Sequence, residues 1–309
     1  MTDDEPDYEI PLHRLPEGFA EAVRRTPDHP AQPRPAATIV LMRDGLSGLE
    51  VLLLRRTRSA GFVPGAYVFP GGRVDPLDAD PELLERLDGL TAQDAAERLH
   101  LGATPATRDV PAVPAVAYYV AALREAFEET GILVARAGGG APPTAAEDPT
   151  VDAVRDDLLE HRITFAQALD RLGCRLDGRA VEYLAHWITP VVEPRRYDTR
   201  FFAARVHGRG RVVIDAREMT DAVWITPADA LQRQHEGSLP MVFPTIRTLE
   251  QLAAYDTVDA ALAELGLRRV PAILPDLVVT PTGVGLRLPQ EVKRIERSDP
   301  DAGIPAGEG

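Results

Sequence analysis

The chain has almost no lysine and almost no cysteine: among its 309 residues, Lys293 is the only lysine and Cys174 the only cysteine. One cysteine excludes an internal disulfide framework and a thiolate metal cluster. The 34 basic residues are outnumbered by 48 acidic ones, which gives a formal charge of −14. This balance argues against nucleic acid or an anionic membrane surface as the partner, since both require a broad basic patch.

Long apolar runs are missing as well. No uninterrupted apolar stretch has the length of a membrane span, and residues 1–9 are acidic, so no signal peptide is predicted. We therefore expect a cytoplasmic protein with no membrane partner. With 44% hydrophobic residues, the chain is predicted to be soluble and globular, with room for one large domain plus appendages. A homodimer is compatible with the sequence, as is a polyanionic small-molecule substrate.

The most informative stretch is an acidic helix expected over residues 124–131. At helical spacing Glu125, Glu128 and Glu129 share one face, and Gly131 supplies the left-handed residue that often ends a helix. Like charges so arranged repel one another unless a cation lies on them, and hard oxygen ligands suit Mg²⁺ or Mn²⁺. The residues indicate either a divalent-metal site or a solvated acidic surface, which taken alone is the commoner case.

A glycine-paired turn precedes this helix in the sequence, at Phe69-Pro70-Gly71-Gly72. Such a turn lets the backbone approach a ligand closely, although an ordinary tight turn would also explain it. Three arginines, Arg55, Arg56 and Arg58, come shortly before it. They could hold a diphosphate or an additional ribose phosphate by bidentate hydrogen bonds, or they could be a solvated strand end.

Together the turn and the helix resemble the Nudix box, in which glycine is followed after five residues by glutamate and, seven residues later, by Arg-Glu-U-x-Glu-Glu-x-Gly-U, with U aliphatic. Gly72 matches the first glycine, and residues 124–132 match the second half in full. There are two departures. Asp78 stands in place of the first glutamate, and the stretch 79–123 replaces the usual seven residues. The RP2-like coenzyme A diphosphatases of peroxisomes are similar in both respects.

This resemblance implies a Nudix-type α/β/α sandwich with a mixed sheet, of the α/β (α+β) class, and Mg²⁺ or Mn²⁺ as cofactor. It implies that Glu125, Glu128 and Glu129 hold the metal. Arg124, on the same catalytic helix, is expected to brace a carboxylate or the glycine turn rather than to touch substrate. Glu218, in a later loop, is a candidate for the further acid that reaches the metals or the attacking water; otherwise it is a surface acid.

Substrate contacts are expected from Gly71, Gly72 and the three arginines before them. Arg195 and Arg196 are further candidates, because they match an Arg-Arg-aromatic-Asp-Thr segment of the RP2-like enzymes. A central strand with a basic edge would explain that segment equally well. The seven histidines show no ligand spacing and are expected to be structural or on the surface.

We expect three parts: an N-terminal arm (1–35), a Nudix domain (36–268) with an insertion (79–119) inside the box, and a C-terminal extension (269–309). Apart from one short helix that its sequence allows, the arm is expected either to lie over the domain or to be loose, and the extension should form one late β-pair. The insertion is either a lid over the acyl or pantetheine end of a substrate or a passive excursion. The other expected elements are strands at 37–42, 50–55 and 132–134, helices at 81–87 and 91–99, and extra C-terminal helices after residue 244.

The function implied by the resemblance is Mg²⁺-dependent cleavage of a diphosphate linkage. The expected substrate is coenzyme A or acyl-coenzyme A, with 3′,5′-ADP and (acyl-)4′-phosphopantetheine as products. Two alternatives remain: a diphosphatase for ADP-ribose or NADH, and a Nudix module that binds a nucleotide without hydrolysing it. The intact acids speak against the second, because a binding module has no need of mutually repelling carboxylates.

Overall fold

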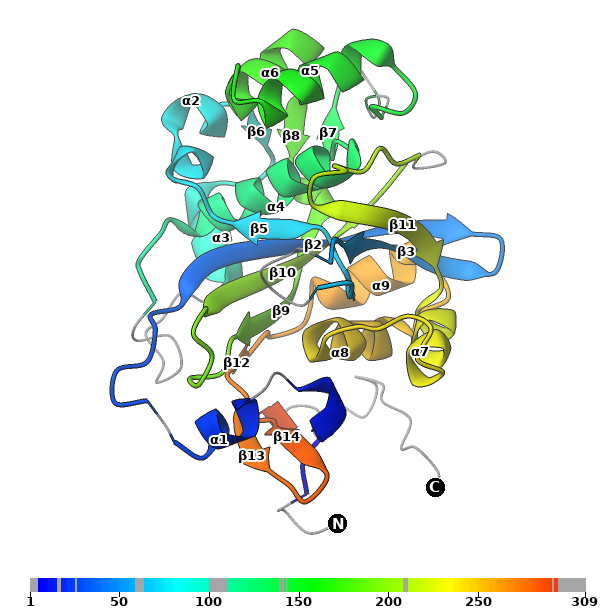
Figure 1. Ribbon diagram of the computed structural model, residues 1–309. Helices are drawn as coiled ribbons and strands as arrows, with labels where there is room; N and C mark the ends of the chain where they lie inside the picture. The colour runs from blue at the N-terminus through cyan, green and yellow to red at the C-terminus, as the bar shows by residue number, and fades with distance from the viewer. Residues whose placement is uncertain are drawn as a thin grey trace.

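The computed structural model describes residues 5–15, 18–25, 27–58, 64–99, 110–138, 140, 142, 144–207, 211–290 and 292–293. Its central feature is a mixed sheet with the strand order β11-β3-β2-β10-β9-β12, to which β4 and β5 add short pairings (Figure 1). The parallel pairs are β2 with β10 and β9 with β12; the other pairs are antiparallel. The bounds are β2 (Arg34–Gly45), β3 (Gly48–Arg56), β4 (Tyr67–Val68), β5 (Gly71–Arg73), β9 (Val181–Ile188), β10 (Tyr197–Arg205), β11 (Met219–Ile225) and β12 (Ala272–Ile273).

Helices cover both faces of this sheet, which confirms the expected α/β/α sandwich (Figure 1). One face carries α4 (Ala115–Thr130), with α5 (Pro149–Leu159) and α6 (Phe165–Leu172) beyond it. The other face carries the extra C-terminal helices, α7 (Pro227–His235), α8 (Phe243–Leu252) and α9 (Val258–Leu265). Among the described residues, no helix is both long and apolar enough to cross a membrane.

The two strands expected from their apolar runs are confirmed as β2 and β3. Within β2, Ile39 and Leu41 pack into the cluster under α4, whereas Val40 and Met42 pack into the cluster under α8 and α9. Side chains alternate between the faces of a sheet. A strand that is covered on both sides therefore has an almost continuous apolar sequence.

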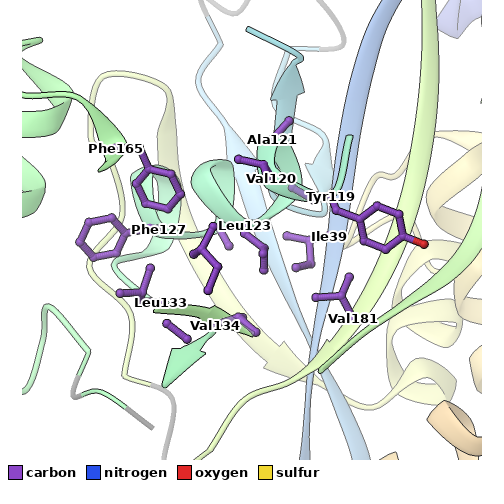
Figure 2. Close-up of a cluster of buried hydrophobic side chains, with 14 of the residues drawn as sticks. Ile39, Tyr119, Val120, Ala121, Leu123, Phe127, Leu133, Val134, Phe165 and Val181 are labelled. Carbon is purple, nitrogen blue, oxygen red and sulfur yellow. The ribbon is translucent and has the colours of Figure 1, made fainter. Parts of the chain in front are cut away.

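Apolar side chains anchor α4 to the sheet and to α6, as Figure 2 shows. Tyr119 packs against Phe202 of β10 with ring centroids 4.4 Å apart, and Phe127 stacks on Phe165 of α6 at 6.4 Å. Leu123, between them on the helix, is fully buried. Burial of each such side chain contributes about 1.5–3 kcal/mol, so the rotation of α4 about its axis is set by its apolar face.

The insertion packs on the body of the domain in the part that the structure describes. Its helices α2 (Pro81–Leu84) and α3 (Ala92–Leu99) lie where the sequence predicts helices, although α2 is three residues shorter than expected. Ala95 and Leu99 of α3 are buried in the core cluster that contains α4. The short strand β6 (Leu87–Asp88) pairs in parallel with β8 (Arg175–Asp177). The insertion is therefore fixed on one side to the core.

One expectation about the chain is wrong, and one pair of alternatives is decided by the structure. Residues 132–134 form no strand: their side chains enter the core cluster, and the strand begins only at β7 (Ala135–Arg136), which pairs with β8. Of the two alternatives for the N-terminal arm, the structure agrees with an arm that lies over the domain in the part that it describes. Besides the expected short helix, α1 (Phe19–Val23), the arm contains β1 (Tyr8–Pro11), which pairs with β14 (Gly283–Arg287).

Arm and extension thus form one small sheet in the order β1-β14-β13, where β13 is Asp276–Val279. The hairpin of β13 and β14 is the expected late β-pair. Pairing with a distant strand could not be read from the arm because its residues, rich in proline and acids, lack strand periodicity. Residues 294–309 of the extension lie outside the described residues.

Gly283→Ala tests this pairing. A Cβ at Gly283 would collide with the backbone carbonyl of Ile10 in β1, so we expect the substitution to release β1 from β14. Backbone amides of residues 7–12 should then exchange with deuterium markedly faster, as measured by mass spectrometry. Gly140→Ala is the control, because a Cβ there meets nothing within 4 Å; equal exchange in both variants would contradict the pairing.

Candidate active site

The acids of α4 lie on the face of the helix that the core does not use. Glu129 is 5% exposed, and the side chains of Glu125 and Glu128 are 14% and 21% exposed. Gly131 follows with φ 72°, and its N–H donates to the carbonyl of Phe127, as expected for a left-handed helix end. The acidic face is therefore largely enclosed and not a solvated surface.

The glycine turn lies directly against these acids. The Gly71 N–H donates to a carboxylate oxygen of Glu129 at 3.0 Å, and a Cβ at Gly72 would collide with the carboxylate of Glu125. On the side of the turn away from α4, a Cβ at Gly71 would lie 2.5 Å from the carbonyl oxygen of Ala37. Close packing on both sides, rather than an unusual φ, thus explains why two glycines stand here.

Arg124 connects the first acid of the motif to the helix. Its guanidinium donates to both carboxylate oxygens of Asp78, at 2.8 and 3.0 Å, and to the carbonyl of Arg73. It also donates to Glu125 and Glu128, each at 2.9 Å. Asp78 is 1% exposed. Arg124 therefore holds three carboxylates and the backbone after the glycine turn in place, which is the bracing position expected for it.

Burial makes negative charge costly at these acids. It raises the pKa of Glu125 to about 7, with Glu128 adding to the rise and Arg124 opposing it. It also raises the pKa of Glu128, and it raises that of Glu129 well above the ordinary value, with the charges of Glu125 and Glu218 adding to the effect. A divalent cation would offset this cost.

The donor set fits a hard divalent cation in chemistry, since it consists of clustered, poorly solvated carboxylates. Among the described residues, no three His, Cys, Asp or Glu side chains are already gathered around one point that suits a metal ion. Glu125 and Glu128 instead bond Arg124, and Glu129 bonds Gly71. Each of these bonds uses one oxygen of its carboxylate, and binding a cation would require the glutamate side chains to converge on one point.

The acids line a cavity of about 1850 Å³, which also reaches the segment between α5 and α6. Of the residues expected at the site, eight line it: Arg56, Gly71, Gly72, Arg124, Glu125, Glu128, Glu129 and Glu218. The cavity continues from there over the sheet towards α8 and the small sheet of the two termini. It is large enough for an extended ligand whose charged end lies at the acids.

Comparison with known proteins agrees with this geometry. Residues 28–252 match the family model described as the NUDT19 Nudix domain. The chain belongs to this family of Nudix hydrolases. Nudix hydrolases cleave diphosphate linkages and generally use divalent metal ions, so the chain is a hydrolase that acts on diphosphate bonds.

Several known proteins align with most of this chain. The human acyl-coenzyme A diphosphatase NUDT19 is 28% identical over 92% of this chain and 80% of its own length. The chicken protein of the same name is 29% identical over 68% and 62%, respectively. A crystal structure of a Nudix hydrolase from Alicyclobacillus acidocaldarius is similar with 31% identity and a TM-score of 0.61, over 77% of this chain and 99% of that one.

Of the three arginines before the Nudix box, only Arg56 lines the cavity. Its buried Nε has no hydrogen-bond partner among the described residues, and its charge opposes the rise in the pKa of Glu129. Arg55 instead lies over the ring of Tyr67, 5.8 Å from its centroid, and Arg58 is exposed. The geometry therefore supports a substrate contact for Arg56 and not for Arg55 or Arg58.

Arg195 and Arg196 are also absent from the cavity lining. Arg196 is buried and donates to the carbonyls of Thr189 and Ala31, at 3.0 and 2.8 Å, so it ties the N-terminal arm to the sheet. Arg195 is exposed. The geometry does not support the expected substrate contacts, because the sequence pattern shows that a strand has a basic edge but not which way each side chain turns.

Glu218 approaches the Nudix helix from the loop before β11. Its carbonyl accepts a hydrogen bond from Thr57 N–H at 2.9 Å, and its own N–H donates to Asp215 at 3.1 Å. The side chain is exposed, lines the cavity and contributes to the raised pKa of Glu129. Its position is compatible with the further acid that the Nudix resemblance implies.

Two residues beside the site were not expected there. Arg155 of α5 is 2% exposed and donates to the carbonyls of Phe127 and Glu128 at the C-terminal end of α4, where a positive charge favours the helix dipole. His161 lines the cavity and is the one described non-glycine residue with positive φ, at 55°. Neither position has a signal in the sequence. Of the seven histidines, His100 lies outside the described residues.

Substitution of the two glycines should separate their roles. Gly71→Ala forces a Cβ into the backbone of β2, so we expect it to destabilise the fold by about 1–3 kcal/mol, measured by urea unfolding. In Gly72→Ala the three atoms nearest to the new Cβ are all in the movable end of the Glu125 side chain, so this variant should keep most of the stability while hydrolysis measured with Mg²⁺ present falls. If Gly72→Ala retains full activity, the contact with Glu125 has no part in the reaction.

Proposed function

We propose that this Nudix hydrolase is a Mg²⁺- or Mn²⁺-dependent diphosphatase for coenzyme A or acyl-coenzyme A. The products would be 3′,5′-ADP and 4′-phosphopantetheine or its acyl derivative. The observation that carries the proposal is the contact of Glu125 and Glu129 with Gly72 and Gly71 in the wall of a large cavity. The names of the human and chicken relatives support the choice of substrate.

Glu125, Glu128 and Glu129 are the residues that would hold the cation. When bound, a divalent cation supplies positive charge to the diphosphate oxygens and acidifies water. Glu128 or Glu218 accepts the proton of the attacking water. The water oxygen forms a bond to one phosphorus, and the bond from that phosphorus to the bridging oxygen breaks. Arg124 positions the acids through its bonds to Asp78 and the glutamates.

Arg56 is the residue that we assign to a phosphate of the substrate. Its unsatisfied buried Nε faces no acceptor among the described residues, and a phosphate oxygen would supply one through a charge-assisted bond. Because its positive charge already acts on Glu129, a diphosphate held by Arg56 would lie close to the acids.

A panel of diphosphates tests the substrate. We expect coenzyme A or acyl-coenzyme A to be cleaved with a higher kcat/KM than ADP-ribose or NADH, with products identified by mass spectrometry. Comparison with dephospho-coenzyme A shows whether the 3′-phosphate is recognised. If ADP-ribose or NADH is the better substrate, the coenzyme A assignment is wrong; if none of these compounds is cleaved with Mg²⁺ or Mn²⁺ present, the proposed function is wrong.

Glu129→Gln tests the acid cluster. The substitution keeps the size of the side chain and removes its charge, so we expect Mg²⁺-dependent hydrolysis to fall to a small fraction of the wild-type rate while the circular dichroism spectrum stays unchanged. Glu97→Gln is the control, since Glu97 is exposed on α3 and outside the cavity lining. A wild-type rate in folded Glu129→Gln would remove Glu129 from the mechanism.

A further inference from the structure

The cavity extends well beyond the acids of α4, to a wall of apolar side chains. Five residues line this distal part: Tyr8, Trp187, Phe243, Leu277 and Leu286. They come from β1, β9, the start of α8, β13 and β14, none of which supplies the acids or Arg56. The acidic part and this apolar part of the cavity are therefore built from different parts of the chain.

Strand register places three of these side chains in one row. Tyr8 lies opposite Leu286 in β1 and β14, and Leu277 lies opposite Leu286 in β13 and β14. Directly paired residues point to the same face of a sheet, so the row forms an apolar face of the small sheet, which lies beside β12 in Figure 1. Tyr8 stacks on Phe243 with centroids 5.1 Å apart, and Phe243 packs edge-on against Trp187 at 5.6 Å. These five residues, here called the apolar strip, connect the small sheet to the central sheet.

One polar atom of the apolar strip has no partner. Trp187 is 6% exposed, and its buried indole Nε1 meets no hydrogen-bond acceptor among the described residues. An unsatisfied buried donor costs free energy that an acceptor oxygen arriving with a ligand would recover. Thr199, directly opposite Trp187 on β10, also lines the cavity. The strip therefore suits a ligand that is mainly hydrocarbon and carries carbonyl oxygens.

We propose that the apolar strip binds the acyl-pantetheine arm of the substrate and that Trp187 donates a hydrogen bond to one of its carbonyl oxygens. This rests on the proposed function, in which the diphosphate lies at the acids and the arm extends from it. The acyl-pantetheine arm is mainly hydrocarbon, made of methylene groups and one dimethyl-substituted carbon, and its polar groups are two amides, one hydroxyl and the thioester, so it matches the strip in polarity. The hydroxyl-rich second ribose of ADP-ribose does not.

Three of the five residues of the apolar strip lie outside the part of the chain that matches the family model. The match runs from residue 28 to residue 252, whereas β1, β13 and β14 lie beyond those limits. The N-terminal arm and the C-terminal extension of the protein thus determine how much hydrocarbon the cavity holds. Leu277 is the position to change, because it is only partly buried and lies on an edge strand of the small sheet.

Neutral fragments of the substrate test the strip without cation or diphosphate. S-decanoyl-pantetheine and S-acetyl-pantetheine are titrated into the full chain by calorimetry. We expect the decanoyl fragment to bind at least about tenfold more tightly, because the strip buries several more methylene groups. Leu277→Thr should reduce this ratio to about threefold or less. Leu267→Thr is the matched control, at a position that is 87% exposed and outside the cavity lining, and should keep the wild-type ratio.

A second pair of variants tests the hydrogen bond. Trp187→Phe keeps the aromatic packing and removes Nε1, so it should weaken binding of both fragments by roughly tenfold. Trp224→Phe, the same change at a residue outside the cavity lining, should not. The proposal is overturned if the decanoyl fragment does not bind, if Leu277→Thr keeps the wild-type ratio, or if both tryptophan variants behave alike. None of these outcomes bears on coenzyme A hydrolysis, which the substrate panel tests separately.

Discussion

The contact between α4 and the glycine turn is the interaction on which the site depends. It brings Glu125 and Glu129 against Gly72 and Gly71 at a place where burial raises the pKa of both acids. Charged groups crowded in this way are unfavourable by themselves. They are held there because the opposite face of α4 is locked into the core, with Leu123 and Phe127 fully buried.

The pair of Asp78 and Arg124 explains how the Nudix box tolerates a long insertion. These residues stand at the two ends of the added segment and meet in a bidentate ion pair. The two ends of the inserted segment are therefore close together, so the insertion leaves the relative positions of the glycine turn and α4 unchanged. An aspartate serves in place of the usual glutamate because its role here is to hold Arg124, which in turn holds Glu125 and Glu128.

The cavity joins a charged part to an apolar part, and the apolar part depends on the N-terminal arm and the C-terminal extension. Tyr8, near the start of the chain, and Leu286, near its end, are neighbours across β1 and β14. Through Phe243 they connect to the same sheet that supports the acids. The parts of the chain that precede and follow the Nudix domain therefore shape the same cavity as the motif itself.

The sequence alone determined the features that follow from local spacing. The helix with its three acids, its glycine end and the apolar strands were predictable because helix and strand periodicities are short-range properties, whereas the sandwich fold was predicted only from the resemblance to the Nudix box. Tertiary structure alone decided that Arg56 rather than Arg55 or Arg58 reaches the cavity, that Arg196 holds the arm, that Arg155 supports α4 and that β1 joins β14. Each of these depends on contacts between residues distant in sequence, and side-chain direction at a strand end is set by whatever packs against it.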